Sequence, residues 1–256
     1  MTETMATRRV LHVLPVAVPP PARAAFAEQL PAEIVDDDVA VEFTAPADGP
    51  LNMIDSAYER TLSDVAVLAA ATGAQADGYA AVVVNSMSDS GLGALRSRLD
   101  IPVVGACQAS MALAGVLGHR IGVITMWPPW HALYPSAASA AGLADRLVSV
   151  RDIGVRPDSA ALLTGREDEI FPVLLDTARA AIDEDDVHVL ILGSTTMHQS
   201  HRYLAEHLPI PVINPGAAAH QLVQQLLRAG LTHSRRGHPS PARPNDEFLA
   251  HLHQGR

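Results

Sequence analysis

Short runs of apolar residues alternate with longer segments rich in alanine and leucine along this chain. The runs are rich in β-branched residues and lack polar residues at alternate positions, as expected of parallel strands that are buried on both faces. Strands that alternate with helices are typical of α/β proteins. We therefore predict strands over residues 9–16, 39–44, 79–85, 101–106, 120–126, 145–150, 187–193 and 210–214, and helices over residues 56–76, 108–117, 136–143, 170–182 and 216–229.

The two ends of the chain need separate interpretations. Arg8 and Arg9 precede the first apolar run, as basic residues do in a secretory signal. The run is short and is interrupted by His12 and Pro15, so we interpret it as a first buried strand. The proline-rich stretch from Pro239 predicts an irregular tail with one short helix. No apolar stretch reaches the roughly 18 residues that a membrane span requires, so we expect a cytoplasmic protein without a membrane partner.

The composition of the chain limits the kinds of partner and site that it can have. The 256 residues are 48% hydrophobic, which is enough for a substantial core. With 18 Lys and Arg against 28 Asp and Glu, the net charge is −10, and no basic stripe could follow a phosphate backbone, so we expect no nucleic-acid partner. Cys107 is the one cysteine, which excludes an internal disulfide, a zinc–thiolate cluster and any mechanism that needs two thiols. We predict no metal site.

An internal repeat organises the chain. The segment "AVVVNSMSD…LDIPVVGA" (81–106) matches "HVLILGSTTMH…LPIPVINP" (188–215). In each copy a buried strand ends in Asn or Gly followed by Ser, and Ile-Pro-Val comes later. Ser86 and Ser194 are 108 residues apart, and the two prolines are 109 apart. The repeat predicts two similar α/β halves, and because ligands bind beyond the carboxyl ends of parallel strands, the two serines should face one another across a crevice.

The motifs "GPLNMIDSAYER", "GYAAVVVNSMSDSGLGALRSRLDIPVVGACQAS" and "LILGSTTM…IPVINPGAAAHQLVQQLL" occur in this order. Over residues 40–230 the chain resembles the aspartate/glutamate/hydantoin racemase superfamily, and most of all its hydantoin racemase branch. The resemblance implies an α/β fold of two pseudo-symmetric, flavodoxin-like parallel-sheet domains, one of residues 1–117 with 215–256 and one of residues 118–214. It also implies no cofactor and a small-molecule substrate in the cleft between the domains. We further expect a homo-oligomer, a dimer or larger.

The sequence departs from that family at the reacting groups. The family uses two cysteines, one at each repeated strand end, as base and acid on opposite faces of a carbon acid, and the matching positions here are Ser86 and Ser194. A thiol with a pKa near 8.5 readily becomes a thiolate, whereas a serine needs a neighbouring base. The family's substrate-anchoring Asn and Ser/Thr after the first strand are also replaced, by "LPVAVPPP".

Several residues are candidates for the site. We predict catalytic roles for Ser86, Ser194 and His198, which follows Ser194 by four residues and could serve as its base. We predict that the substrate-binding residues are Asn85, Met87, Gly49, Pro50, Thr125, Trp127, Thr195 and Thr196. Simpler structural roles stay open, because Ser and Thr also cap helices. Trp127, Trp130 and Tyr134 could wall a pocket for an apolar substituent or only pack at the seam between the domains.

Three functions fit this pattern. The first is an isomerase of the racemase type that acts at a carbon next to a carbonyl, in a small carboxylate or a hydantoin-like substrate. The second is a lyase or decarboxylase, which stabilises an enolate without needing two bases. The third is a binding protein that has kept the pocket and lost turnover. A fold does not choose between them, because function depends on the site.

Overall fold

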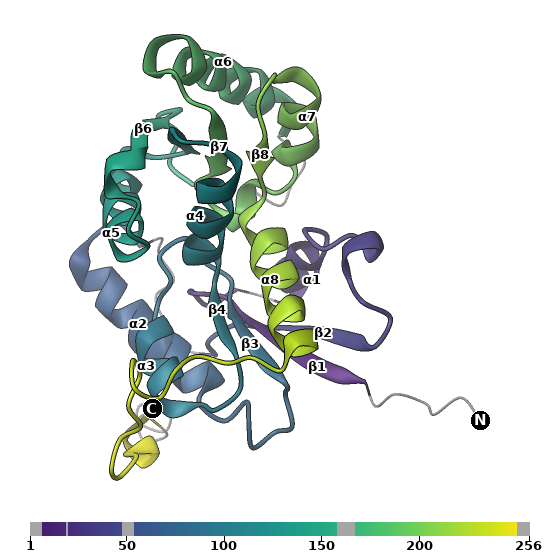
Figure 1. Cartoon of the computed structure of the whole chain (residues 1–256), viewed down its shortest axis with the longest axis vertical. Helices are drawn as coiled ribbons and strands as arrows, with labels where there is room; N and C mark the ends of the chain where they lie inside the picture. Colours follow the sequence, from purple (N-terminus) through teal and green to yellow (C-terminus); the bar gives the residue numbers. More distant parts are fainter. Residues whose placement is uncertain (1–6, 19, 48–53, 158–166, 250–256) are drawn as a thin grey trace.

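The computed structural model describes residues 7–18, 20–47, 54–157 and 167–249 and contains two parallel sheets of the same topology. The first sheet has the order β2 (Val39–Thr44), β1 (Arg8–Val13), β3 (Ala81–Val84) and β4 (Val103–Gly105). The second has the order β6 (Leu147–Asp152), β5 (Ile121–Thr125), β7 (Val189–Leu192) and β8 (Val212–Ile213). Every neighbouring pair is parallel. The prediction of two similar α/β halves is therefore confirmed, and Figure 1 shows one half above the other.

Helices connect these strands, and one more follows the last strand. The α-helices described between residues 7 and 229 are α1 (Pro20–Ala27), α2 (Ala57–Ala71), α3 (Leu92–Arg98), α4 (Ala106–Leu117), α5 (Leu133–Ala140), α6 (Glu167–Asp185), α7 (Ser200–His207) and α8 (Pro215–Ala229). The sequence pattern did not predict α1, α3 or α7. The proline run that opens α1 reads as a loop, although proline is well tolerated in the first turn of a helix. The other two are short, with seven and eight residues.

The prolines of the repeat explain why β4 and β8 begin later than predicted. Pro102 and Pro211 each lack a backbone N–H, so neither can donate to a ladder. Their carbonyl oxygens still accept, from Val82 at 2.9 Å and from Leu190 at 2.9 Å. The equivalent hydrogen bonds in the two sheets show that the sequence repeat is also a repeat in the structure.

Successive residues of the strands in the first sheet face opposite layers of helices. Val82 and Val84 pack with α2 and α3, whereas Ala81 and Val83 pack with α4 and α8. This is the period-2 pattern of a sheet that is covered on both faces. The C-terminal helix α8 thus returns to the first sheet, where it contacts β3 and β4, while α4 contacts β7 of the second sheet. Figure 1 shows α4 and α8 side by side between the halves. The exact domain boundaries, at 117 and 215, stay a prediction.

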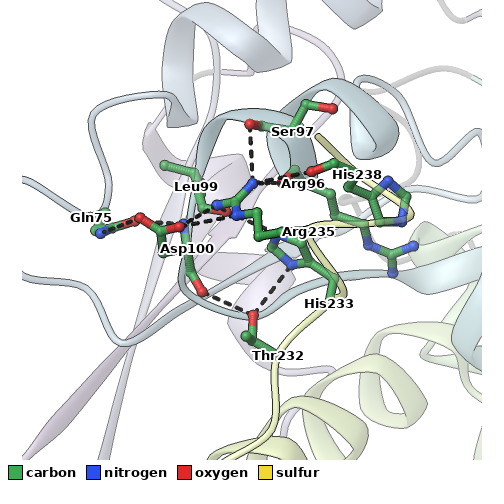
Figure 2. Close-up of polar contacts among 9 residues, drawn as sticks. All are labelled: Gln75, Arg96, Ser97, Leu99, Asp100, Thr232, His233, Arg235 and His238. Carbon is green, nitrogen blue, oxygen red and sulfur yellow. Dashed lines mark hydrogen bonds and ion pairs between the residues drawn. The ribbon is translucent and has the colours of Figure 1, made fainter. Parts of the chain in front are cut away.

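After α8 the chain is fastened to the corner between α3 and β4 (Figure 2). The Arg235 guanidinium donates to the carbonyl oxygens of Arg96, at 2.7 Å, and of Leu99. It also pairs with Asp100 at 2.6 Å, and the Thr232 hydroxyl donates to the Asp100 carbonyl at 2.9 Å. The terminal segment is therefore held against the first half by backbone acceptors as well as by charge. No helix in the described part of the chain is long and apolar enough to cross a membrane.

Candidate active site

A cavity of about 80 Å³ lies where the loops after β3 and β7 meet. Residues with hydroxyl groups line one part of it: Ser86, Ser88, Ser194, Thr195 and Thr196. Apolar side chains line the rest, among them Leu14, Val16, Phe26, Ile54, Trp130 and Leu133. The site therefore has one polar and one apolar region, which is the usual composition of a small-molecule pocket.

The two loops carry the same hydroxyl geometry. In the first half Ser86 Oγ lies 2.7 Å from Ser88 Oγ and accepts from the Ser88 N–H at 3.2 Å. In the second half Ser194 Oγ lies 2.8 Å from Thr196 Oγ1 and accepts from the Thr196 N–H at 3.2 Å. Each serine thus closes a tight turn over the residue two positions on. The repeat places two equivalent hydroxyl pairs on one cavity, which is the arrangement that the sequence predicted.

The predicted site residues fall into two groups. The cavity is lined by Ser86, Met87, Ser194, Thr195 and Thr196. The other group does not line it: Asn85, Thr125, Trp127 and His198. Gly49 and Pro50 lie outside the described residues.

Two of the residues that do not line the cavity have other partners. The Trp127 ring centroid lies 5.5 Å from the Arg156 guanidinium carbon, and Trp130 lines the cavity instead. His198 Nδ1 lies 3.0 Å from the Thr195 carbonyl oxygen. Because a carbonyl only accepts, the ring carries a proton on Nδ1. The helix on which His198 and Ser194 would share a face does not begin until Ser200, so the assumed helical spacing does not apply.

The sequence matches the Asp/Glu/hydantoin racemase family model over residues 24–223. The chain belongs to this family. It is therefore an enzyme of the racemase type. The hydantoin racemase of Pseudomonas sp. (strain NS671) is 26% identical over 194 residues, which are 75% of this chain and 76% of the relative. The resemblance inferred from the sequence motifs is thus confirmed.

Solved structures of the racemase fold superpose on this chain. Allantoin racemase from Klebsiella pneumoniae has a TM-score of 0.86 at 20% identity and covers 95% of this chain and 99% of its own. Allantoin racemase from Pseudomonas fluorescens has a TM-score of 0.80 at 25% identity, with 93% and 98% covered. A mutant of arylmalonate decarboxylase has a TM-score of 0.63 at 17% identity, with 88% and 94% covered. Racemases and a decarboxylase therefore share this fold.

A buried tyrosine fixes the second loop of this racemase-family enzyme. The Tyr134 hydroxyl donates to the Gly193 carbonyl oxygen at 2.7 Å and lies 2.9 Å from Thr125 Oγ1. Burial raises the pKa of Tyr134, so the hydroxyl stays neutral and can donate. A Cβ on Gly193 would lie 2.6 Å from the tyrosine oxygen, so only glycine fits here. Thr125 and Tyr134 therefore hold the strand end that presents Ser194.

A buried network holds the first loop from behind. The Asn85 amide nitrogen donates to Gln29 Oε1 at 3.1 Å and lies 3.0 Å from His12 Nδ1. His12 Nε2 in turn lies 3.1 Å from His220 Nδ1, on α8. Burial, with the charge of the neighbouring His220, lowers the pKa of His12, and burial lowers the pKa of His220 to about 4. Both rings are therefore neutral at pH 7, and the Asn85 side chain belongs to this network.

Sequence reasoning missed these supporting residues for different reasons. His12, Gln29 and His220 come from β1, the segment after α1, and α8, and no spacing rule links such distant positions. The sequence does contain a signal for Ser90, because Ser86, Ser88 and Ser90 occur at every second position and could therefore form one group. Ser88 fits both a capping role and a ligand contact in the sequence, and the structure places it in the cavity wall.

Asp89 joins the first loop to α4. Its carboxylate accepts from the backbone N–H of Cys107 at 3.0 Å and of Gln108 at 2.9 Å. Asp89 has a φ of 48°, and a Cβ on Gly105 would lie 2.3 Å from its Oδ1. Burial raises the pKa of Asp89 to about 6, although the two N–H bonds act in the opposite direction. Burial likewise raises the pKa of the Cys107 thiol, which makes that thiol a poor nucleophile.

Replacing Asp89 with asparagine should remove one component of the pH dependence of stability. Because the pKa of Asp89 is raised from 3.8 to about 6 in the folded state, the folded protein binds the carboxyl proton more tightly than the unfolded chain does. The stability that results is fully present below pH 3.8 and is lost as the pH rises through 6. The stability of the native protein relative to Asp89→Asn should therefore fall by on the order of 2 kcal/mol between pH 4 and pH 7. Urea unfolding of both proteins between pH 4 and pH 7 measures this change in stability. If the two free energies of unfolding differed by the same amount at every pH, the raised pKa of Asp89 would be wrong. Asparagine is a suitable replacement because it tolerates the positive φ at this position.

Proposed function

We propose that this protein is a cofactor-independent racemase that exchanges the proton on a carbon next to a carbonyl group. The observation that carries the proposal is the pair of equivalent hydroxyls, Ser86 and Ser194, that line one cavity from the ends of repeated strands. Inversion at carbon needs groups on both faces of the reacting centre, and two halves that each supply one loop meet that need. Relatives named hydantoin racemase support the same class of chemistry.

The cavity suggests a small substrate. A cavity of about 80 Å³ is much smaller than the several hundred Å³ of a site for a drug-sized ligand. A hydantoin ring with a short alkyl group, or a carboxylate of similar size, is a ligand of this smaller kind. The hydroxyls suit the carbonyl and N–H groups, and Phe26, Trp130 and Leu133 suit the substituent. We therefore propose 5-methylhydantoin as the first substrate to test.

The proton acceptor must differ from that of enzymes with two thiols. In the described part of the cavity wall no Asp, Glu, His, Lys or Cys is present. A serine is a weak base alone, so we propose that a water held by the hydroxyls accepts the proton and that the serines donate hydrogen bonds to the developing enolate oxygen. On the opposite face a second bound water gives a proton to the carbon, which completes the inversion, and the hydronium and hydroxide that the two waters become neutralise one another through solvent. This mechanism predicts slower turnover than a thiolate would give.

Incubation in deuterated water tests the proposed function. L-5-methylhydantoin should gain deuterium at C5 and lose optical activity together, faster than in buffer alone. A disubstituted malonate serves as the probe for the lyase, with carbon dioxide as the readout. Release of carbon dioxide from the malonate without any exchange at the hydantoin would replace the racemase by a decarboxylase. Binding of the hydantoin without either reaction would indicate a binding protein.

Ser86→Ala and Ser194→Ala should each lower the rate of deuterium exchange by at least about 10-fold, because each removes one hydroxyl that stabilises the transition state. Ser200→Ala is a matched control. Ser200 is also buried and its hydroxyl donates to the Met197 carbonyl at 2.8 Å, but it does not line the cavity. Exchange rates and melting temperatures of the three variants are the measurements. Full activity in both cavity variants would show that the hydroxyls are not part of the reaction centre.

A further inference from the structure

A tryptophan from the second half forms part of the apolar wall of the cavity. Trp130 lies on the 3₁₀ turn Pro128–Ala132, directly before α5, and only 6% of its surface is exposed. It belongs to the apolar core of the second half, together with Met126 and Tyr134, and Met87 of the first half is part of the same core. The Trp130 ring is therefore a packed part of the interior and not a mobile group at the surface.

The other apolar side chains of the described wall are all smaller than tryptophan. Among them, Leu14, Val16, Phe26 and Ile54 come from the first half and Leu133 from the second. Because interior side chains are close-packed, the wall cannot move outward without displacing the core behind it. In a cavity of about 80 Å³, Trp130 therefore takes more space from a ligand than any other residue of the described wall.

The two parts of the wall suit different parts of a ligand. The hydroxyl groups of Ser86 and Ser194 suit the carbonyl and N–H groups of a hydantoin ring, because polar groups that leave water need hydrogen-bond partners. The substituent at C5 of the ring is apolar and is left to the apolar part of the wall. The largest side chain in that part then limits the size of the substituent.

We propose that Trp130 sets the upper limit on the size of the substituent that the substrate carries at C5. The native cavity accepts a short alkyl group, such as methyl, and rejects a benzyl group, because forcing extra atoms into a packed interior is costly. Trp130 is thus a specificity residue and takes no part in proton transfer. The inference rests on the proposed function for its choice of ligand, since it takes a hydantoin as the substrate of the same cavity.

Substitutions at Trp130 can be matched to the substituent, atom for atom. Leucine has six fewer non-hydrogen side-chain atoms than tryptophan, and a benzyl group has six more carbon atoms than a methyl group. Phenylalanine has three fewer, and an isobutyl group has three more carbon atoms than methyl. Exchanges that conserve volume are the best tolerated in a packed interior. Trp130→Leu should therefore prefer 5-benzylhydantoin, and Trp130→Phe should prefer 5-isobutylhydantoin.

The rates of deuterium exchange at C5 measure this preference. Each kcat/KM is divided by the exchange rate in buffer alone, because the substituent also changes the acidity of C5. Relative to the native protein, the benzyl-to-methyl ratio should rise by about 100-fold in Trp130→Leu and the isobutyl-to-methyl ratio by about 10-fold in Trp130→Phe. One methylene group in an apolar pocket already changes kcat/KM by about 10- to 200-fold. A merely structural role for Trp130 would lower all the rates without changing the order of the substrates.

Trp127→Leu is the matched control. It removes the same six atoms from a ring that lies beside Arg156 and does not line the cavity, so its ratios should equal those of the native protein. Unchanged ratios in folded Trp130→Leu and Trp130→Phe would overturn the inference and leave the proposed function intact. A native protein that exchanged 5-benzylhydantoin as fast as 5-methylhydantoin would do the same. Should Trp130→Leu not fold, Trp130→Phe alone decides.

A native protein that exchanged none of the three hydantoins would show that the proposed function is wrong. The dissociation constants of the three compounds, measured by calorimetry, would then decide the inference, because a steric limit acts on binding as well as on turnover. The same order of preference among the native protein and the Trp130 variants would support Trp130 as the limit. Ratios of dissociation constants that did not differ between these proteins would overturn it.

Discussion

The double variant Ser86→Cys, Ser194→Cys should exchange the substrate proton about 10²-fold faster than the native enzyme, or more. The physical reason is acidity: a thiol with a pKa near 8.5 supplies a few per cent of thiolate at pH 7, whereas a serine hydroxyl supplies almost none. Base catalysis by a well-placed group contributes typically 10²–10⁴-fold. The two serines already line one cavity, so the new sulfur atoms would sit at the positions that the repeat makes equivalent.

The single variants make this prediction sharper. With one thiolate, deuterium should enter one enantiomer of 5-methylhydantoin much faster than the other, because the base reaches only one face of the carbon. With both thiolates, the two enantiomers should exchange at similar rates and optical activity should be lost. Ser200→Cys adds a thiol outside the cavity and controls for non-specific effects. Iodoacetamide should remove the gain, since the native Cys107 is fully buried. A folded double variant that binds the hydantoin without any gain would contradict the placement of the serines.

The buried pair of histidines should make the protein sensitive to acid. Both rings have lowered pKa values in the folded state, and that of His220 is about 4 against 6.5 in the unfolded chain. The stability that they contribute is present above pH 6.5 and is lost as the pH falls toward 4, because the unfolded chain then binds protons that the folded protein does not. For His220 the loss amounts to about 3 kcal/mol. Asp89 acts in the opposite direction over part of this range, so substitutions are needed to separate the contributions.

His220→Asn isolates the contribution of His220. Asparagine can place an amide oxygen near the position of His220 Nδ1 and accept from His12 Nε2, but it does not titrate. The free energy of unfolding in urea should then fall less steeply between pH 6.5 and pH 4 than in the native protein. His207→Asn, at an exposed histidine, is the control and should leave the slope unchanged. An equally steep loss in His220→Asn would show that other groups cause the acid sensitivity.

Much of the fold could be predicted from sequence because the buried strands carry a strong signal. The apolar runs at 39–44 and 187–193, and the repeat that relates Ser86 to Ser194, needed no tertiary information. The element ends were less predictable, since β1 stops at Val13 although the apolar run continues to Val16. Leu14 and Val16 instead line the cavity. An apolar residue in a pocket wall and one in a strand look the same in sequence.

The site was predictable only as far as the repeat reached. Ser86 and Ser194 were found by symmetry, but Trp127 and Trp130 could not be separated, because a short 3₁₀ turn over Pro128–Ala132 decides which ring faces inward. The networks behind the loops depend on contacts between distant segments, such as Ser63 with Ser90 and His12 with His220. Such pairs follow from how the helices pack, and no local pattern records them.

The positions of α4 and α8 between the two halves suggest how such a chain could arise by duplication. Each follows the last strand of its own half. α8 then packs on β3 and β4 of the other half, and α4 packs on β7 of the other half as well as on β4 of its own. If the halves descend from one duplicated unit, that unit would have exchanged its last helix with a second copy of itself, as in domain swapping. The present chain then corresponds to a swapped dimer joined into one polypeptide. Neither half carries the complete helical cover of its own sheet, because each sheet is covered in part by a helix that follows the last strand of the other half.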